Sequence, residues 1–284
     1  MIPRANITAW RAHAPWATDA QVEQDLVITR ALIEIFRDPR LAAALAFRGG
    51  TALHKLFFRP AARYSEDIDL VQVTAEPIGP VMTPLRGRLD PWLGAAQYKQ
   101  GEGRVTLVYR FESEGLPATR MRLKVEINTR EHFAVLGYRR ERVTVANPWF
   151  NGDAEVVTFA LEELLGTKLR ALYQRKKGRD AFDLARAIQE HPRVDRAKII
   201  ECFSEYTQRG GTPISRAEFE RNLADKEADG AFLTDVHALL ATVTEGGSGT
   251  SASGLYDARE ALALVRRELI ELLPNKASRP RQRR

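Results

Sequence analysis

The chain has 284 residues, of which 44% are hydrophobic and 28% are charged, a composition typical of a folded globular protein rather than a disordered or fibrous one. No apolar run approaches the ~18–20 residues needed to cross a bilayer, and the N-terminal segment lacks the apolar core of a signal peptide, so we expect a cytoplasmic protein with no membrane contact. Cys202 is the only cysteine, which excludes an internal disulfide, and we expect it to be buried and without a catalytic role.

The net charge of +6 is concentrated at the C-terminal end. Of the 43 Lys and Arg residues, five lie in residues 276–284 with no acidic residue, which leaves 38 basic against 37 acidic side chains elsewhere. We expect this tail to be disordered and to assist RNA or partner binding only through long-range attraction. The body is nearly neutral, so its local clusters are more informative than its total charge.

A long helix and a strand–helix unit open the predicted fold. Apolar residues recur at helical spacing over 19–36, with Asp19 as a cap at the start and Pro39 beyond the end. Residues 45–48 form a short apolar run typical of a strand, and residues 51–58 return to a helical pattern.

Two glycines separate that strand from the helix that follows it. Gly49 and Gly50 permit close approach to the backbone, and the free N–H groups at a helix start attract an anion. We therefore expect a tight turn that cradles the phosphates of a nucleoside triphosphate. A plain turn is the alternative.

The candidate metal ligands come next. Residues 67–73 alternate between polar and apolar, which predicts a strand with one face in the core. Asp67 and Asp69 project to the same side of such a strand and can share a divalent cation, which would relieve the repulsion between them. Mg²⁺ is the expected ion, with Mn²⁺ as a substitute. By itself an Asp-x-Asp pair is as often structural.

The middle of the chain predicts a helix and then strands. The expected ranges are 77–93 for the helix and 104–112, 120–128 and 142–146 for the strands. In the second of these strands, one face carries Arg120, Arg122, Lys124, Glu126 and Asn128, while the other face is apolar. Glu126 is a candidate third carboxylate that ligates metal or takes a proton from an attacking hydroxyl; a cross-strand pair with Lys or Arg is the alternative.

From residue 161 onward the pattern is helical. Gly210 and Gly211 interrupt it, and a Gly/Ser-rich stretch at 245–254 predicts a flexible loop. We place the lobe boundary near residue 151. The expected organisation is an N-terminal lobe at 1–151, a helical lobe at 152–275 and the basic tail at 276–284.

A basic cluster marks the start of the helical lobe. Residues 168–179 contain six basic side chains and no acid. Lys168 is expected on a helix and Arg175 and Lys177 in the turn after it, where they can clamp nucleotide phosphates. A solvated helix face is the alternative.

Two acids follow this cluster. Asp183 is expected to orient Lys168 or the nucleophile, whereas Asp180 is expected to pair with Arg179 or Arg186. The histidines lack metal-ligand spacing, and the glycine-rich motifs of P-loop and Rossmann proteins are absent, so a zinc site and these two nucleotide-binding folds have no support.

Four segments in this order resemble the AbiEii/MenT family of nucleotidyltransferase toxins of bacterial toxin–antitoxin systems: FRGGTALHKLF, RYSEDIDL, LKVEI and TKLRALYQRKKGRDAFDL. The resemblance runs from Trp16 to Arg186. It implies an α+β, DNA polymerase β-like nucleotidyltransferase fold, with a mixed sheet and flanking helices, joined to a helical C-terminal lobe. It also implies Mg²⁺-dependent transfer of NMP from an NTP to the 3′ acceptor end of tRNA, which blocks aminoacylation and translation, and a cognate antitoxin as partner.

Carried over residue by residue, the resemblance implies that Asp67 and Asp69 are metal ligands, that Lys168 holds the triphosphate and that Asp183 is a further essential acid. Ser65 is a candidate nucleotide-binding residue. It matches a position that is phosphorylated in some members when the antitoxin silences the toxin. Thr51 stands where related enzymes often carry Ser, and it would supply the hydroxyl there.

Three functions remain open from the sequence. The first is transfer to RNA, for which Arg120, Arg122 and Lys124 can track a phosphate backbone. The second keeps the chemistry but transfers to a small molecule or a protein hydroxyl. The third is a non-catalytic scaffold that binds RNA or the antitoxin. This function predicts the loss of at least one of four residues, and all four are present: Asp67, Asp69, Glu126 and Lys168.

Overall fold

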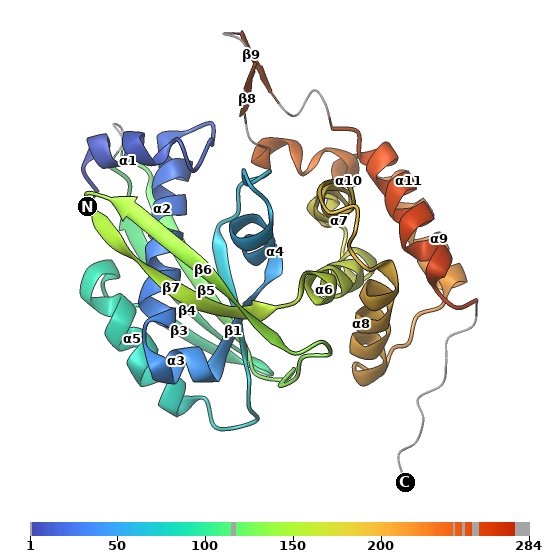
Figure 1. The fold of residues 1–284 in the computed structure, drawn as a ribbon, viewed down its shortest axis with the longest axis horizontal. Coiled ribbons are helices and arrows are strands. Elements are labelled where there is room, and N and C mark those ends of the chain that lie inside the picture. Colours follow the sequence, from blue (N-terminus) through green and yellow to red (C-terminus); the bar gives the residue numbers. More distant parts are fainter. Residues whose placement is uncertain (1, 115–117, 241, 246–247, 252–255, 276–284) are drawn as a thin grey trace. The chain divides into compact units, whose positions relative to one another are not determined.

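The structure is a computed structural model that describes residues 2–114, 118–240, 242–245, 248–251 and 256–275. The chain divides into two compact units, one formed by Met1–Phe159 with Ala241–Gly249 and the other by Ala160–Leu240 with Thr250–Arg284 (Figure 1). The predicted basic tail at 276–284 lies outside the described residues.

The first unit is built on a mixed seven-stranded sheet with the order β3-β4-β5-β2-β1-β7-β6 (Figure 1). Its strands are β1 (Leu45–Arg48), β2 (Asp67–Gln72), β3 (Gln97–Gly101), β4 (Arg104–Glu112), β5 (Arg120–Asn128), β6 (Tyr138–Asn147) and β7 (Phe150–Phe159). The pairs β2–β5 and β1–β7 are parallel, and the other pairs are antiparallel. The predicted α+β class with a mixed sheet and flanking helices is confirmed.

The helical segments of the first unit are α1 (Arg4–Trp10), α2 (Asp19–Phe36), α3 (Pro39–Ala44), α4 (Gly49–Ala52), the π-helical η1 (Leu53–Phe57) and α5 (Gly79–Leu93). The predicted range of α2 is correct, but its cap is Thr18 rather than Asp19, because Thr18 and Gln21 exchange the two hydrogen bonds of a capping box. No separate residues lie between β1 and α4: β1 ends at Arg48 and α4 begins at Gly49, whose φ of +83° lies in the left-handed region that favours glycine.

The predicted lobe boundary near residue 151 falls inside β7. This strand pairs along its whole length with β6 and also contacts β1, so it belongs to the sheet, and the two units divide after Phe159. The turn-like pair Asn151 and Gly152 lies in the β6–β7 hairpin, where Gly152 is opposite Val145.

The second unit is helical, as predicted. It contains α6 (Leu161–Gln174), α7 (Gly178–Glu190), α8 (Arg196–Arg209), α9 (Arg216–Glu227), α10 (Gly230–Thr234), η2 (His237–Leu239), α11 (Ala258–Glu268) and η4 (Ile270–Leu272). Helix α8 ends just before Gly210 and Gly211, as the sequence predicts. None of the described helices is long and apolar enough to cross a membrane.

The Gly/Ser-rich stretch at 245–254 is not wholly a loop. Strands β8 (Thr242–Glu245) and β9 (Ser248–Ser251) form a two-stranded sheet, whose backbone hydrogen bonds favour extended chain in spite of the composition. Residues 246–247 and 252–254 of the predicted loop lie outside the described residues.

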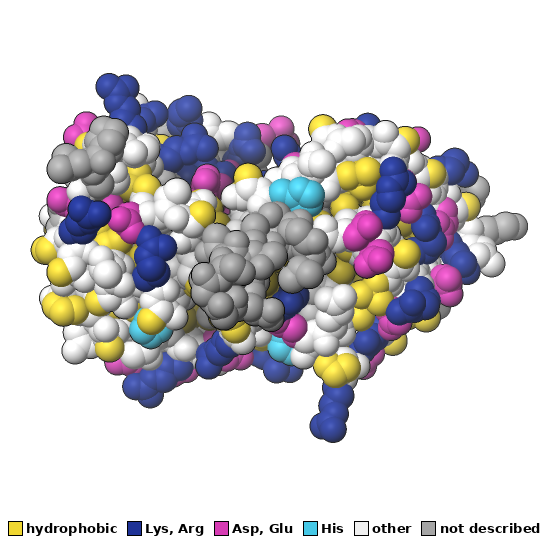
Figure 2. All heavy atoms as spheres, turned by 90° about the horizontal axis from the view of Figure 1, so that it is seen from above, with side chains coloured by type: hydrophobic (Ala, Val, Ile, Leu, Met, Phe, Trp, Pro, Cys, Tyr) yellow, Lys and Arg dark blue, Asp and Glu magenta, His cyan; other side chains and the backbone are white. Residues whose placement is uncertain are grey.

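Cys202 is fully buried in the second unit, as predicted. A Cβ at Gly166 on α6 would lie 2.7 Å from the Cys202 Cβ, so the glycine lets α6 and α8 pack closely. Burial raises the pKa of the thiol to about 12, which keeps it protonated and unreactive at neutral pH. On the face drawn in Figure 2, Lys and Arg side chains are scattered among acidic and neutral ones, in keeping with a nearly neutral body.

Candidate active site

The candidate metal ligands lie on strand β2 at the centre of the sheet. Ile68 and Leu70 are buried in the core, and the intervening Asp67 and Asp69 occupy the opposite face and are only partly covered, as the alternation predicts. The parallel register places Asp67 beside Lys124 and Asp69 beside Glu126 on β5. Strand pairing therefore gathers three carboxylates and one ammonium on two adjacent strands.

Lys124 is the cation among these carboxylates. Its Nζ lies 3.0 Å from Asp67 Oδ2 and 3.6 Å from Glu126 Oε2. Burial acts to lower the pKa of Lys124, but the hydrogen bond to Asp67 and the charges of Asp67, Glu126 and Asp69 outweigh it and raise the pKa above its usual value. Glu126 contacts a basic residue of its own strand, whereas the alternative considered for it was a cross-strand pair; its cross-strand partners are Asp69 and Thr106. Lys124, expected as a contact for RNA, is instead paired with the carboxylates.

The surroundings of Asp69 disfavour its charged form. Burial, and then the negative charges of Asp67 and Glu126, raise its pKa, while the positive charges of Arg48 and Lys124 oppose the rise. A bound divalent cation would remove this cost, and the donor set consists of oxygen atoms, which Mg²⁺ prefers. The residues therefore fit a hard cation held by a pair of carboxylates.

A complete site of three carboxylates is not formed. Among the described residues, no group of three or more His, Cys, Asp and Glu side chains is close enough together to hold a metal ion. Lys124 contacts both Asp67 and Glu126, and this accounts for the difference from the predicted set of Asp67, Asp69 and Glu126.

Gly49 packs directly against this cluster. Its φ is +83°, and a Cβ built on it would lie 2.3 Å from Asp69 Oδ2. Both the backbone conformation and the contact require glycine. The sequence predicts close approach of a ligand to this backbone, and the structure shows close approach of the chain's own carboxylate. Gly50 follows as the second residue of α4.

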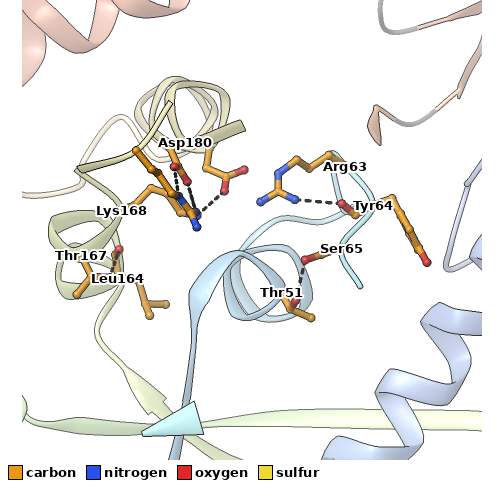
Figure 3. Close-up of polar contacts among 10 residues, drawn as sticks. Thr51, Arg63, Tyr64, Ser65, Leu164, Thr167, Lys168 and Asp180 are labelled. Carbon is orange, nitrogen blue, oxygen red and sulfur yellow. Dashed lines mark hydrogen bonds and ion pairs between the residues drawn. The ribbon is translucent and has the colours of Figure 1, made fainter. Parts of the chain in front are cut away.

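Thr51 and Ser65 join the start of α4 to the start of β2. Thr51 Oγ1 donates to the Asp67 carbonyl oxygen at 2.5 Å and lies 2.7 Å from Ser65 Oγ (Figure 3). Because the one hydroxyl proton of Thr51 is used on the carbonyl, Ser65 is the donor in the second bond. Thr51 is buried, so its hydroxyl positions the Asp67 backbone rather than being presented to a ligand.

In the second unit, Lys168 is buried between two fully buried acids of α7. Its Nζ lies 3.0 Å from Asp183 Oδ2 and 3.2 Å from Asp180 Oδ1 (Figure 3). The predicted contact between Lys168 and Asp183 is present. Two carboxylates around one ammonium fix the position of the nitrogen.

The predicted pairing of Asp180 with Arg179 or Arg186 is wrong. It faces α6 and accepts hydrogen bonds from Arg175 Nε at 2.7 Å and Nη2 at 2.8 Å, in addition to its contact with Lys168. Arg186 pairs with Glu190 one turn further along α7. Burial acts to raise the pKa of Asp180, but the charges and hydrogen bonds of Lys168 and Arg175 outweigh it and lower the pKa.

Some of the basic side chains predicted to clamp phosphates instead form ion pairs with acidic residues of the same chain. Arg175 makes a bidentate contact with Asp180, and Lys176 lies 3.4 Å from Asp229 Oδ2. Lys177 is exposed and immediately precedes α7. Sequence reasoning missed Lys124 and Asp180 as members of these clusters. For Lys124 a signal was available, because it lies two residues before Glu126 on the same face of the predicted strand.

We compared the chain with known families, curated proteins and solved structures. A family model described as "Nucleotidyl transferase AbiEii toxin, Type IV TA system" matches residues 30–263. Among solved structures, the fold is similar to MenT4, nucleotidyltransferase toxin Rv2826c from Mycobacterium tuberculosis H37Rv, with a TM-score of 0.59 and 17% identity over 96% of this chain and 91% of that chain. An antigenic nucleotidyltransferase-like protein from Paracoccidioides brasiliensis matches with a TM-score of 0.38 and 18% identity, over 70% and 93% of the two chains. No curated protein matches.

Proposed function

The chain belongs to the AbiEii family of nucleotidyltransferase toxins, and we propose that it transfers NMP from an NTP to the 3′ acceptor end of tRNA in a Mg²⁺-dependent reaction that blocks aminoacylation and translation. A cognate antitoxin follows from membership in a type IV toxin–antitoxin family. The observation that carries the catalytic part is that the parallel pairing of β2 with β5 places Asp67, Asp69 and Glu126 on one face of two adjacent strands.

The geometry supports a hydroxyl attack on the α-phosphorus of the nucleotide. Asp67 and Asp69 would hold Mg²⁺, which supplies neutralisation of the phosphate charge when bound. Glu126 lies beside Asp69 and accepts the proton that the attacking hydroxyl releases. The new bond joins the acceptor oxygen to the α-phosphorus, and the bond to pyrophosphate breaks. A cation held by Asp67 would compete with Lys124, whose ammonium group contacts both Asp67 and Glu126.

The glycine segment supports the phosphate part of the proposal. Gly49 and Gly50 head α4, so their backbone lies next to Asp69 with no side chain between. Thr51 and Ser65 fix the carbonyl of Asp67 and thereby the position of the metal ligands. For the second unit, we propose that Lys168 binds the triphosphate, and that Asp180 and Asp183 fix its ammonium group.

A labelled-nucleotide assay tests this function. The purified chain is incubated with total tRNA, Mg²⁺ and each α-labelled NTP in turn, next to an Asp67→Asn variant. Asp153→Asn is the matched control, because Asp153 is an exposed carboxylate of the same sheet that pairs with Arg142 at the surface. We expect label in tRNA with the wild type and the control, and a decrease of at least about a hundredfold in Asp67→Asn, because metal ligands supply several kcal/mol of transition-state stabilisation.

Two other outcomes would redirect the proposal. Label that enters small molecules or protein, and not tRNA, would retain the chemistry and replace the acceptor. Absence of any transfer or NTP binding in the presence of Mg²⁺ would contradict the enzyme.

A further inference from the structure

A cavity of about 720 Å³ lies in the first unit. Its walls come from the first turns of α2, from the segment before β2, and from the paired ends of β4 and β5. Glu66, the residue before Asp67, is one of the lining residues. The cavity therefore reaches the chain position next to the candidate metal ligands.

Three arginines, Arg110, Arg120 and Arg122, and two acids, Glu66 and Glu112, line the cavity, so its charge is positive on balance. Arg110 on β4 and Arg122 on β5 are direct cross-strand partners, and Arg120 lies two residues away on the same face. All three are exposed, and within the described ranges no ion pair involves any of them. Like charges directly opposite each other destabilise a sheet. An anion bound between Arg110 and Arg122 would remove that cost.

The other walls suit a nucleobase. Tyr64, Phe111 and Met121 provide an apolar surface, and Gln21 adds an amide. Tyr64 is held edge-on by Trp16, with ring centroids 5.9 Å apart, so the aromatic wall is anchored in the core. Guanidinium groups beside an aromatic wall are typical of sites that bind single-stranded RNA, where unstacked bases pack on aromatic rings.

Gln24 ties this cavity to the catalytic strand. Its Nε2 donates to the carbonyl oxygens of Glu66 at 3.3 Å and of Arg122 at 3.0 Å, immediately before β2 and β5 pair at Asp67 and Lys124. Arg122 and Lys124 share a face of β5 and are ~6.5 Å apart along the strand. A nucleotide whose phosphate lies between the arginines can therefore place its terminal ribose near the carboxylates.

The strand order separates the two substrates. In the sequence β4-β5-β2-β1, the arginine cavity lies on the β5 side of Asp67, while Gly49 follows β1 on the other side. In phosphoryl transfer the attacking and leaving oxygens are roughly in line on opposite sides of the phosphorus. If the triphosphate lies at the glycine segment, the attacking hydroxyl has to arrive from the side of the cavity.

We propose that this cavity binds the single-stranded 3′-terminal nucleotides of the acceptor RNA, with Arg110 and Arg122 on a phosphate and Tyr64 and Phe111 against a base. The assignment rests on the proposed function and adds to it the place and chemistry of acceptor binding. Arg120 also lines the cavity, opposite Glu112 on β4.

The double variant Arg110→Gln/Arg122→Gln tests this assignment. Arg139→Gln/Arg140→Gln is the matched control, since it removes the same charge from two exposed positions of β6 at the far edge of the same sheet. We expect the KM for tRNA to rise about tenfold or more in the cavity variant, with the KM for NTP and the kcat at saturating tRNA within about twofold of wild type; the control should resemble wild type. The log–log slope of RNA affinity against salt concentration should weaken by about 0.7 for each phosphate that the variant no longer neutralises.

A binding measurement separates this proposal from the proposed function. Fluorescence anisotropy with a labelled RNA hairpin that ends in a single-stranded 3′ overhang, compared with the same hairpin made blunt, requires no catalysis. Tighter binding of the overhang by wild type, absent in the cavity variant and retained in Arg110→Lys/Arg122→Lys, supports the cavity even if transfer to RNA fails. Equal binding of both hairpins, an unchanged KM for tRNA, or a rise in the KM for NTP instead would overturn it. Circular dichroism melting shows whether each variant is folded.

Discussion

Gly49 lies against the carboxylate of Asp69, so closely that a Cβ at position 49 would stand 2.3 Å from Asp69 Oδ2. The two residues meet because β1 and β2 are antiparallel and Arg48, the last residue of β1, is the register partner of Asp69. The absence of a side chain at Gly49 thus makes room for the carboxylate of Asp69. This packing explains why the Gly49-Gly50 pair and the Asp67-x-Asp69 strand occur together.

Gly49→Ala is expected to destabilise the protein by about 2 kcal/mol or more, since alanine at positive φ costs ~1 kcal/mol and the new methyl group forces Asp69 to move. Transfer activity should fall with it. Gly87→Ala is the control: Gly87 lies within α5 with open space around it, and alanine there should be neutral or stabilising by up to ~1 kcal/mol. Urea unfolding of both variants measures the difference, and equal stabilities would contradict the account.

Asp69→Asn should abolish transfer and yet stabilise the metal-free protein at neutral pH. The folded-state pKa of Asp69 is raised, so the folded state binds more protons than the unfolded state, and stability falls as pH rises above the ordinary Asp pKa toward the folded value. The neutral asparagine removes this dependence. Urea unfolding at pH 4 and pH 7.5 should show a larger gain at the higher pH; a decrease in stability at both values would refute this assignment.

Mg²⁺ should stabilise the wild type and not the carboxylate variants. A ligand that binds only the folded state adds free energy in proportion to the logarithm of its concentration over Kd, so at a hundredfold excess over Kd the gain is about 2.7 kcal/mol. We expect the Tm of the wild type to rise with Mg²⁺, and that of Asp67→Asn or Asp69→Asn to stay constant. A parallel rise in all three proteins would indicate binding elsewhere.

Asp180→Ala should be strongly destabilising, by about 3–5 kcal/mol, because it leaves the buried Lys168 and its neighbour Arg175 without their shared carboxylate. The control Glu205→Ala breaks an exposed pair with Arg209 and should cost less than about 1 kcal/mol. The pKa of Asp180 is lowered, so its contribution is complete above the ordinary Asp pKa and is lost as pH falls below it. Denaturation at pH 7 and pH 3 tests both statements, and equal destabilisation by Asp180→Ala and Glu205→Ala would contradict them.

The strongly periodic elements could be predicted from the sequence. Helix α2 and strands β1, β4 and β5 have the predicted ranges. In β4 and β5 alternate residues are buried, whereas β1 is a short apolar run buried on both faces. Strand β3 was missed: all of its residues are exposed at the sheet edge, so no core imposes an alternation on it. Strand β7 was missed, and the predicted lobe boundary falls inside it. Its position depends on pairing with β6, which precedes it in a hairpin, and with β1, which is distant in the sequence.

The strand face that carries the candidate metal ligands could be predicted from the sequence, whereas the partners of several candidate residues could not. Alternation alone places Asp67 and Asp69 on one face, but the partners of Asp180 depend on which side of α7 packs against α6, and that is a tertiary property. Likewise, the role of Lys124 follows from the parallel pairing of β2 with β5, which residue spacing does not specify.

The central claim is that the Asp67–Asp69 pair catalyses nucleotidyl transfer to the 3′ hydroxyl of tRNA. The most direct test is a single-turnover reaction of the wild type and Asp67→Asn with an α-labelled NTP, Mg²⁺ and either intact tRNA or tRNA whose 3′-terminal ribose has been oxidised with periodate. We expect label at the 3′ end of intact tRNA with the wild type alone, and none in the oxidised tRNA. Equal labelling of intact and oxidised tRNA, or full activity of Asp67→Asn, would contradict it.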